Sequence, residues 1–217
     1  MSQVDDPTYK VCKELTRILK PLSKAGKSFI KNSSHLKDML RDVSIDEDCN
    51  LASLDVVALY PSIPVKKALE IVREKLNEDD TLQGRTKWKV DDTMKLLEIS
   101  IETHFMTLDG RIFTQTDGCP IGKSISGEIA EIYMNWFEET YVFDQGNPFK
   151  PIFWKRMRDD IFVIWRDADK ECSKSRGSDD LDQFVWKLNG CERRIQFTLE
   201  REKDRVLPFL DMSLKRW

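Results

Sequence analysis

Hydrophobic residues recur along the chain at two spacings, one typical of helices and the other of strands. Apolar residues that return every three or four positions form one face of a helix, whereas short apolar runs bounded by turn residues indicate buried strands. The helical spacing predicts helices over residues 8–20, 34–43, 65–76, 90–105, 124–142 and 178–188. The strand pattern predicts strands over residues 51–57, 151–157, 161–165, 195–201 and 206–215.

Turn and capping residues set the expected limits of these elements. Pro21 is expected to end the first helix, and Ser34 and Ser178 to cap two others. Asp109-Gly110 lies between two apolar stretches and predicts a hairpin, and a second hairpin is expected with residues 158–160 at its tip. Because helices and strands are intermingled and the hairpins are tight, the order favours an α+β fold with an antiparallel or mixed sheet covered by helices.

Composition limits the classes of protein that the chain can belong to. It has 217 residues, of which 40% are hydrophobic and 34% charged, and this balance excludes wholesale disorder and a disulfide-rich miniprotein. No apolar run approaches the ~18 residues that a membrane span needs, and the first residues do not resemble a secretion signal. Five cysteines without a CxxC spacing argue against a disulfide framework or a zinc site. We expect an intracellular protein without a membrane partner; nucleus and cytoplasm are not distinguished.

Charge is distributed unevenly along the chain. Residues 10–41 carry nine Lys or Arg and two acids, whereas residues 42–186 carry 29 acids and 18 Lys or Arg. A metal-binding centre with flanks that contact a polyanion has this pattern, and so does a solvated surface with patches of charge.

Two acidic positions differ from the many others in their context. Asp159-Asp160 lies between two strongly apolar strands, and Asp55 is a single charge within an apolar strand pattern. Two carboxylates at a rigid hairpin tip repel each other unless a cation lies between them. Magnesium prefers such oxygen ligands, and two strands carrying these acids can form a two-metal site for displacement at phosphorus. A turn and a strand-end acid are the structural alternatives.

Six runs of sequence, in this order and at this spacing, resemble one family over nearly the whole chain, from about Pro7 onward. The family is the reverse transcriptase domain of Penelope-like retroelements, which is similar in its polymerase core to telomerase. The runs are LDVVALYPSIP (54–64), QTDGCPIG (115–122), EIAEIYM (128–134), DDIFVI (159–164), IQFTLERE (195–202) and LPFLDM (207–212).

The resemblance implies the palm of a right-hand polymerase and a role for each matching residue. Asp55, Asp159 and Asp160 are the expected catalytic residues and, with the Val56 carbonyl, the expected ligands of two Mg²⁺ ions, which Mn²⁺ can replace. Tyr60 matches the aromatic residue that excludes a 2′-hydroxyl. The residues expected to contact the template and the incoming nucleotide are Gln115, Gly118, Gly122 and Lys123. The residues expected in the hairpin that grips the primer end are Phe209, Leu210 and Asp211.

The implied activity is RNA-directed DNA polymerisation, with an RNA template, a DNA primer and deoxynucleoside triphosphates as partners. The whole chain, 1–217, is expected to be one palm-centred fragment with fingers, thumb and endonuclease domain largely missing. Residues 1–50 are its basic helical lead-in, 51–165 carry the catalytic motifs, and 178–217 form a helix and the primer-grip hairpin. The oligomeric state is not indicated.

Two positions depart from the family pattern. Met157 stands where the family has Tyr, two residues before the Asp pair, and Lys123-Ser124 replaces Ser-Pro after Gly122. Because a palm is expected here without fingers or thumb, an inactive retroelement remnant, or a fragment that only binds nucleic acid or protein, is an alternative to the enzyme. A P-loop NTPase is a minor alternative, because the segment 118–124 is close to that motif but has three residues between its glycines where four are needed.

Overall fold

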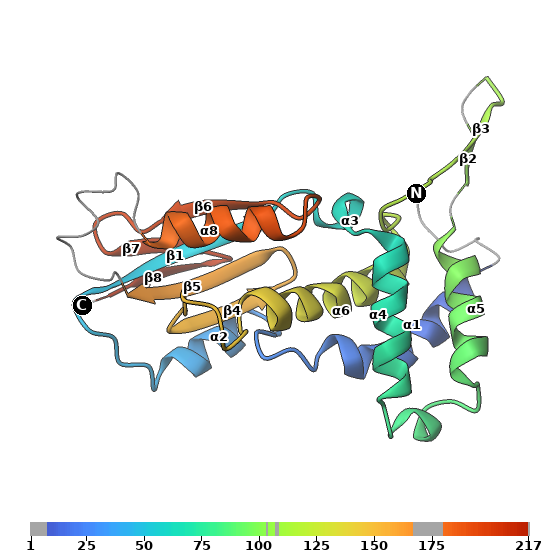
Figure 1. Ribbon diagram of the computed structural model, residues 1–217, viewed down its shortest axis with the longest axis horizontal. Coiled ribbons are helices and arrows are strands. Elements are labelled where there is room, and N and C mark those ends of the chain that lie inside the picture. Colours follow the sequence, from blue (N-terminus) through green and yellow to red (C-terminus); the bar gives the residue numbers. More distant parts are fainter. Residues whose placement is uncertain (1–7, 103, 107–108, 167–179, 217) are drawn as a thin grey trace. The chain divides into compact units, whose positions relative to one another are not determined.

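The computed structural model describes residues 8–102, 104–106, 109–166 and 180–216, and the chain divides into two compact units (Figure 1). We call residues 1–26 and 58–136 the helical unit, and residues 27–57 and 137–217 the sheet unit. Each unit is therefore assembled from separate parts of the sequence. The predicted cap residue Ser178 lies outside the described residues.

Three helices with one apolar face each form the core of the helical unit. α5 packs against both α1 and α4, and all three bury residues at helical spacing, such as Leu15 and Ile18 of α1. A separate two-stranded antiparallel sheet, β2–β3, follows α5. The elements are α1 (Tyr9–Ser23), α3 (Leu59–Ser62), α4 (Val65–Asn77), the 3₁₀ turn η2 (Leu82–Gly84), α5 (Val90–Ile101), β2 (His104–Met106), β3 (Ile112–Thr114) and most of α6 (Ser124–Tyr141).

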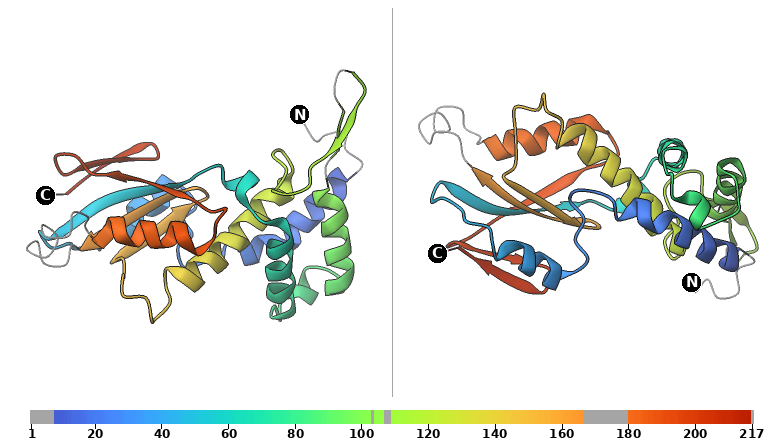
Figure 2. Two further views of the ribbon diagram at one scale, coloured as in Figure 1. Left: turned by 45° about the horizontal axis from the view of Figure 1, so that its top comes forward. Right: turned by 90° about the horizontal axis from the view of Figure 1, so that it is seen from below.

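A four-stranded sheet is the centre of the sheet unit. Its order is β4-β5-β1-β6, and neighbouring strands are antiparallel. A second hairpin, β7–β8, and the helix α2 lie on one face of this sheet, and α8 lies on the other (Figure 2). The elements are α2 (Ser33–Leu40), β1 (Cys49–Val56), β4 (Phe153–Met157), β5 (Asp160–Arg166), α8 (Asp180–Cys191), β6 (Phe197–Arg201), β7 (Val206–Phe209) and β8 (Met212–Lys215).

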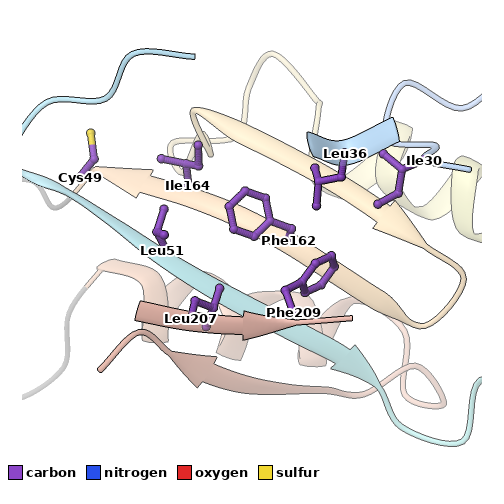
Figure 3. Packing of buried hydrophobic residues seen from close by; sticks show 8 residues of the cluster. All are labelled: Ile30, Leu36, Cys49, Leu51, Phe162, Ile164, Leu207 and Phe209. Carbon is purple, nitrogen blue, oxygen red and sulfur yellow. The ribbon is translucent and has the colours of Figure 1, made fainter. Parts of the chain in front are cut away.

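Apolar side chains cover both faces of the sheet. On the α8 face, Phe184 stacks on Trp165 at 5.1 Å between ring centroids and contacts Trp154 edge-on. On the opposite face, a cluster of buried residues joins the sheet to α2 and β7 (Figure 3). This cluster consists of Ile30, Leu36, Cys49, Leu51, Phe162, Ile164, Leu207 and Phe209.

The predicted α+β class and most elements agree with the structure, but several predicted boundaries are wrong. α1 continues through Pro21 to Ser23, because proline in the last turn of a helix removes a single hydrogen bond. Asn32, not Ser34, caps α2, since its side chain accepts a hydrogen bond from the His35 N–H at 2.9 Å.

Two further predictions extended one element across a turn. The predicted helix 90–105 ends at Ile101, because the Glu102 backbone is extended (ψ 133°) and leads into the β2–β3 hairpin. The predicted strand 206–215 is two strands, because Leu210 adopts a positive φ of 53° and reverses the chain. That turn has no glycine at the reversal, so the local sequence does not signal it.

Phe162 lies at the centre of the cluster, 1% exposed and in contact with Phe153 and Phe209. We expect Phe162→Ala to lower the free energy of unfolding by about 3–5 kcal/mol, because it leaves a cavity that the surrounding side chains cannot fill. Denaturant titration followed by circular dichroism measures the change. Ile152→Ala is the control, since Ile152 is 47% exposed and its loss should cost less than about 0.5 kcal/mol. Equal losses would contradict the assignment of this core.

Candidate functional site

The three predicted metal-binding aspartates lie at one end of the four-stranded sheet. β1 and β5 pair so that Asp55 is directly opposite Asp160, and Thr198 of β6 is opposite Asp55 on its other side. Asp159 immediately precedes β5, and its carbonyl accepts a hydrogen bond from the Val56 N–H at 3.0 Å. The antiparallel pairing thus brings together acids that are far apart in the sequence.

The buried strand predicted over residues 51–57 is present as β1, but Asp55, whose apolar surroundings suggested a buried charge, is exposed. β1 presents alternate residues to opposite faces of the sheet, as an antiparallel strand does. Leu54 and Val56 are buried on one face, whereas Ser53 is half-buried and Asp55 exposed on the other. The carboxylate is therefore accessible to a ligand from solution.

The three carboxylates affect one another electrostatically. Although the residue is exposed, the pKa of Asp55 is raised above the ordinary aspartate value, first because neighbouring atoms partly remove the carboxylate from water and then by the charge of Asp159. The pKa of Asp160 is raised by burial and by the charges of Asp159 and Asp55. Such a group of oxygen ligands favours either a proton or a cation between its members. Carboxylate oxygens are the ligands that a hard divalent cation such as Mg²⁺ prefers, although among the described residues these three do not form a group whose ligand atoms all lie within 4.8 Å of one another.

A cavity of about 250 Å³ adjoins Asp55 and Asp160 on the face that carries β7–β8. Phe209 is buried in the cavity wall, and Leu210 is half-buried at the hairpin turn. Asp211, the third residue of the predicted primer grip, is exposed and lies outside the lining. The cavity is lined by Ser53, Leu54, Asp55, Asp160, Thr198, Glu200, Pro208, Phe209 and Leu210.

Three polar residues of this cavity were not predicted from the sequence. Ser53 is two residues before Asp55 in β1, and Thr198 and Glu200 are two residues apart in β6. Ser53 is opposite Glu200, so all of these residues belong to the same face of the sheet. Period-two polarity in 53–55 and 198–200 was the available signal, but it is informative only once the strand register is known.

A different acidic group lies at the opposite end of β1. Asp46, Asp48 and Cys49 each offer a ligand atom within 4.8 Å of the others, the one such group in the described part of the chain. Arg166 forms ion pairs with both aspartates, to Asp48 at 3.2 Å. Because Arg166 already pairs with both carboxylates, we assign no metal to this group.

The predicted nucleotide-contacting glycines form a tight loop in the helical unit. Gly118 and Gly122 have positive φ angles of 81° and 98°, which side chains rarely allow. A Cβ atom at Gly118 would lie 2.8 Å from the carbonyl oxygen of Pro61, and the adjacent Cys119 N–H donates to the Tyr60 carbonyl at 2.8 Å. The glycine therefore allows the loop to pack against the segment that carries Tyr60.

Two polar side chains of this loop form hydrogen bonds with backbone groups. The Gln115 side-chain amide donates to the carbonyls of Asp117 and Gly118 at 3.0 and 2.9 Å. The Asp117 carboxylate accepts from the N–H of Val65, the first residue of α4, at 3.1 Å. An acid that caps a neighbouring helix, after an exposed antiparallel strand, is unlike a P-loop, so the structure gives no support to the NTPase alternative.

Lys123 and Tyr60 also have neighbours within the helical unit. The Lys123 ammonium donates to the carbonyls of Ser100 and Glu102, both at 2.8 Å, at the C-terminal end of α5. It thereby satisfies carbonyls that the helix itself leaves unpaired. The half-buried Tyr60 has its hydroxyl near Gly127 of α6. The roles of both residues toward a nucleotide stay predictions.

Comparison with known proteins gives matches in structure but not in sequence. No protein-family model matches the chain, and a search of curated proteins returned no match. Telomerase from Candida tropicalis, truncated from its C-terminal domain, has a TM-score of 0.62 with 13% identity over 98% of this chain and 45% of its own. Telomerase from Candida albicans, in complex with a fragment of telomeric RNA, has a TM-score of 0.64 with 10% identity, over 94% and 36%.

A viral enzyme has the same likeness. The RNA-dependent RNA polymerase of BmCPV, at its elongation state, has a TM-score of 0.61 with 11% identity over 97% of this chain and 20% of its own. The chain thus spans less than half the length of each of these proteins. Together they show that it has a reverse-transcriptase-like polymerase fold. Among the described helices, none is both long and apolar enough to cross a membrane.

The raised pKa values make stability depend on pH and on metal. The folded chain holds protons on Asp55 and Asp160 to a higher pH than the unfolded chain, so the free energy of unfolding falls as pH rises from the ordinary aspartate range through the raised pKa values. At pH 7 without metal, we expect Asp159→Asn to raise the free energy of unfolding by up to about 1 kcal/mol. Thermal melts at pH 7 and below pH 4 measure this gain, which should vanish in acid.

The effect of added Mg²⁺ on thermal stability is a second test of the repulsion among the three aspartates. Because a ligand of the folded state stabilises it by mass action, we expect Mg²⁺ to raise the melting temperature of the wild type and to do so much less for Asp159→Asn. A wild type that is insensitive to both Mg²⁺ and the substitution would contradict the electrostatic assignment.

Gly118→Ala tests the packing of the loop. We expect a loss of about 1–3 kcal/mol in the free energy of unfolding, because alanine is strained at positive φ and its Cβ would overlap the Pro61 carbonyl. Gly84→Ala is the control, since nothing lies within 4 Å of its Cβ position. Chemical denaturation of the two variants decides: equal stabilities would rule out a conformational need for glycine at position 118.

Proposed function

We propose that this chain is the palm-centred core of an RNA-directed DNA polymerase of the Penelope-like retroelement group. It extends a DNA primer on an RNA template with deoxynucleoside triphosphates. The proposal rests on the sequence resemblance and on a reverse-transcriptase-like polymerase fold. Retroelement origin, the primer and the nucleotide substrates are part of the proposal.

One observation supports this proposal most strongly. Asp55 and Asp160 are opposite each other at the ends of β1 and β5, Asp159 is adjacent, and the β7–β8 hairpin forms a wall of the same cavity. A cluster of carboxylates at strand ends, next to a cavity, suits a site for two divalent cations and a phosphate-bearing substrate. The electrostatic coupling of the three acids supports the same interpretation.

The proposed reaction is nucleotidyl transfer. The primer 3′-hydroxyl loses its proton to water, its oxygen forms a bond to the α-phosphorus of the incoming nucleotide, the bond from that phosphorus to the bridging oxygen breaks, and pyrophosphate leaves. Bound Mg²⁺ ions lower the pKa of the primer hydroxyl and neutralise charge on the leaving group. Asp55, Asp159, Asp160 and the Val56 carbonyl would hold these ions.

Other residues position the substrates. Tyr60 excludes a 2′-hydroxyl on the incoming nucleotide, and the loop with Gly118 and Gly122, which Gln115 braces, contacts the template and the nucleotide. Phe209 and Leu210 hold the primer end at the cavity, with Asp211 at the turn beside them. Lys123 contributes through the end of α5, whose carbonyls it binds. Base pairing with the template, not the protein, selects the base.

Primer extension tests the proposal directly. With Mg²⁺, an RNA template and a labelled DNA primer, we expect template-directed extension that Asp159→Asn reduces at least about a thousandfold, since it removes a ligand that bears several kcal/mol of transition-state stabilisation. Asp204→Asn is the matched control, because Asp204 is exposed in the turn before β7 and asparagine tolerates its positive φ of 52°.

The possible outcomes separate the enzyme from its alternatives. Extension that is lost in Asp159→Asn and kept in Asp204→Asn supports a working polymerase core in which Met157 is tolerated. If the folded chain binds primer–template but does not extend it, even when fingers and thumb are supplied in a longer chain, the proposal fails. The chain is then a remnant or a nucleic-acid-binding fragment.

A further inference from the structure

A buried arginine lies directly beneath the proposed catalytic tip. Arg156 of β4 is 1% exposed and is the largest fully buried side chain among the described residues. A buried guanidinium is costly unless its charge is balanced and its donors are used. Glu138 of α6, also 1% exposed, supplies this balance: Arg156 Nε donates to its Oε1 at 2.8 Å and Nη2 to its Oε2 at 3.4 Å.

The carboxylate of Glu138 is itself fully engaged. The Trp154 indole N–H donates to Oε1 at 2.9 Å, and the Ser28 hydroxyl donates to Oε2. Each oxygen of Glu138 therefore accepts from Arg156 and from one further donor. This arrangement fixes the carboxylate in one orientation and, with it, the guanidinium that it holds.

The remaining donor group of Arg156 reaches the hairpin tip. Nη1 donates to the carbonyl of Arg158 at 3.0 Å, and Arg158 has a positive φ of 61°. A non-glycine residue in this region is strained and persists only where its surroundings hold it. The next carbonyl, that of Asp159, is held from the other side by the Val56 N–H at 3.0 Å. Both peptide groups that flank the first aspartate are thus fixed.

The backbone of Arg156 is anchored as well. Its N–H donates to the Ser28 carbonyl at 2.7 Å, and its carbonyl accepts from the Ile30 N–H at 3.0 Å. Residues 28–30 therefore extend the sheet edge beside β4. The backbone that carries the guanidinium is therefore held in place relative to the hairpin tip.

We propose that Arg156, held by Glu138, is a positioning residue that keeps the Arg158–Asp160 tip in the conformation that binds divalent cations. A buried ion pair adds little stability compared with apolar residues of similar size, so its contribution here is the geometry of the tip. This inference rests on the proposed function, because it assigns metal binding to Asp159 and Asp160.

Arg156→Lys tests the proposal with conserved charge. Lysine can pair with Glu138, but a single ammonium lacks the planar fork that reaches both the carboxylate and the Arg158 carbonyl. We expect the affinity for Mn²⁺, measured by electron paramagnetic resonance of the free ion, to fall about tenfold, as for residues that orient metal ligands. In primer extension, kcat should fall by a similar factor with the KM for nucleotide unchanged.

Arg166→Lys is the matched control, because Arg166 ends the neighbouring strand β5, is exposed and pairs with Asp46 and Asp48. It should bind Mn²⁺ like the wild type. Circular dichroism melts ensure that each variant is measured while folded.

The outcomes distinguish this inference from the proposed function. If the wild type shows no Mn²⁺ binding that depends on Asp159, the proposed function and this inference both fail. If such binding exists and folded Arg156→Lys retains full affinity, the inference fails and the proposed function stands. Should Arg156→Lys not fold, Trp154→Phe decides, since it removes one donor to Glu138 and keeps the aromatic ring. An affinity reduced about threefold supports the inference, and an unchanged affinity overturns it.

Discussion

Mutual repulsion among three carboxylates is the constraint on which the proposed site depends. Asp55, Asp159 and Asp160 lie at the ends of adjacent strands, and two of them have raised pKa values because of burial and of one another's charge. Like charges repel, and the repulsion grows as the groups are removed from water. The fold must offset this cost until a cation is bound.

The apolar cluster on the same face of the sheet supplies the offset. A buried Leu or Phe contributes about 1.5–3 kcal/mol, and eight buried residues join the sheet to α2 and β7 there. Every second residue of β1 and β5 belongs to this face of the sheet. The face is apolar near Leu51 and Ile164, and it is polar near Asp55 and Asp160. The β7–β8 hairpin takes part in both regions, since Phe209 belongs to the cluster and also lines the cavity.

Much of the fold and part of the site could be predicted from the sequence. The hairpin with Asp159-Asp160 at its tip was predictable because two strongly apolar runs flank a short polar segment. Short apolar runs bounded by polar turn residues are typical of buried strands. The burial of Arg156 and Glu138 was not predictable, since charged residues in a strand and in a long helix are usually exposed and only tertiary pairing buries them. The hydrophobic pattern missed the turn at Leu210, because leucine gives no local signal for positive φ, and only the family resemblance implied a hairpin over residues 209–211.

Predicted site residues differ in how far strand register alone determines their position. Strand register places Asp55 opposite Asp160, and the period-two pattern then adds Thr198 and Glu200 to the cavity wall. By contrast, the side chains of Gln115 and Lys123 donate hydrogen bonds to backbone carbonyls of the helical unit. A long polar side chain can reach several hydrogen-bond partners. Which one it binds depends on the surrounding tertiary packing, which a short sequence motif does not determine.

Under the proposed function, Met157 stands where the resemblance implies a tyrosine. Met157 is opposite Asp160 in the β4–β5 register and packs half-buried against the apolar cluster. The contacts that hold the tip come from the Arg156 guanidinium and the Val56 N–H, and neither involves the side chain at position 157. Under the proposed function, methionine in place of that tyrosine therefore leaves the support of the aspartates intact.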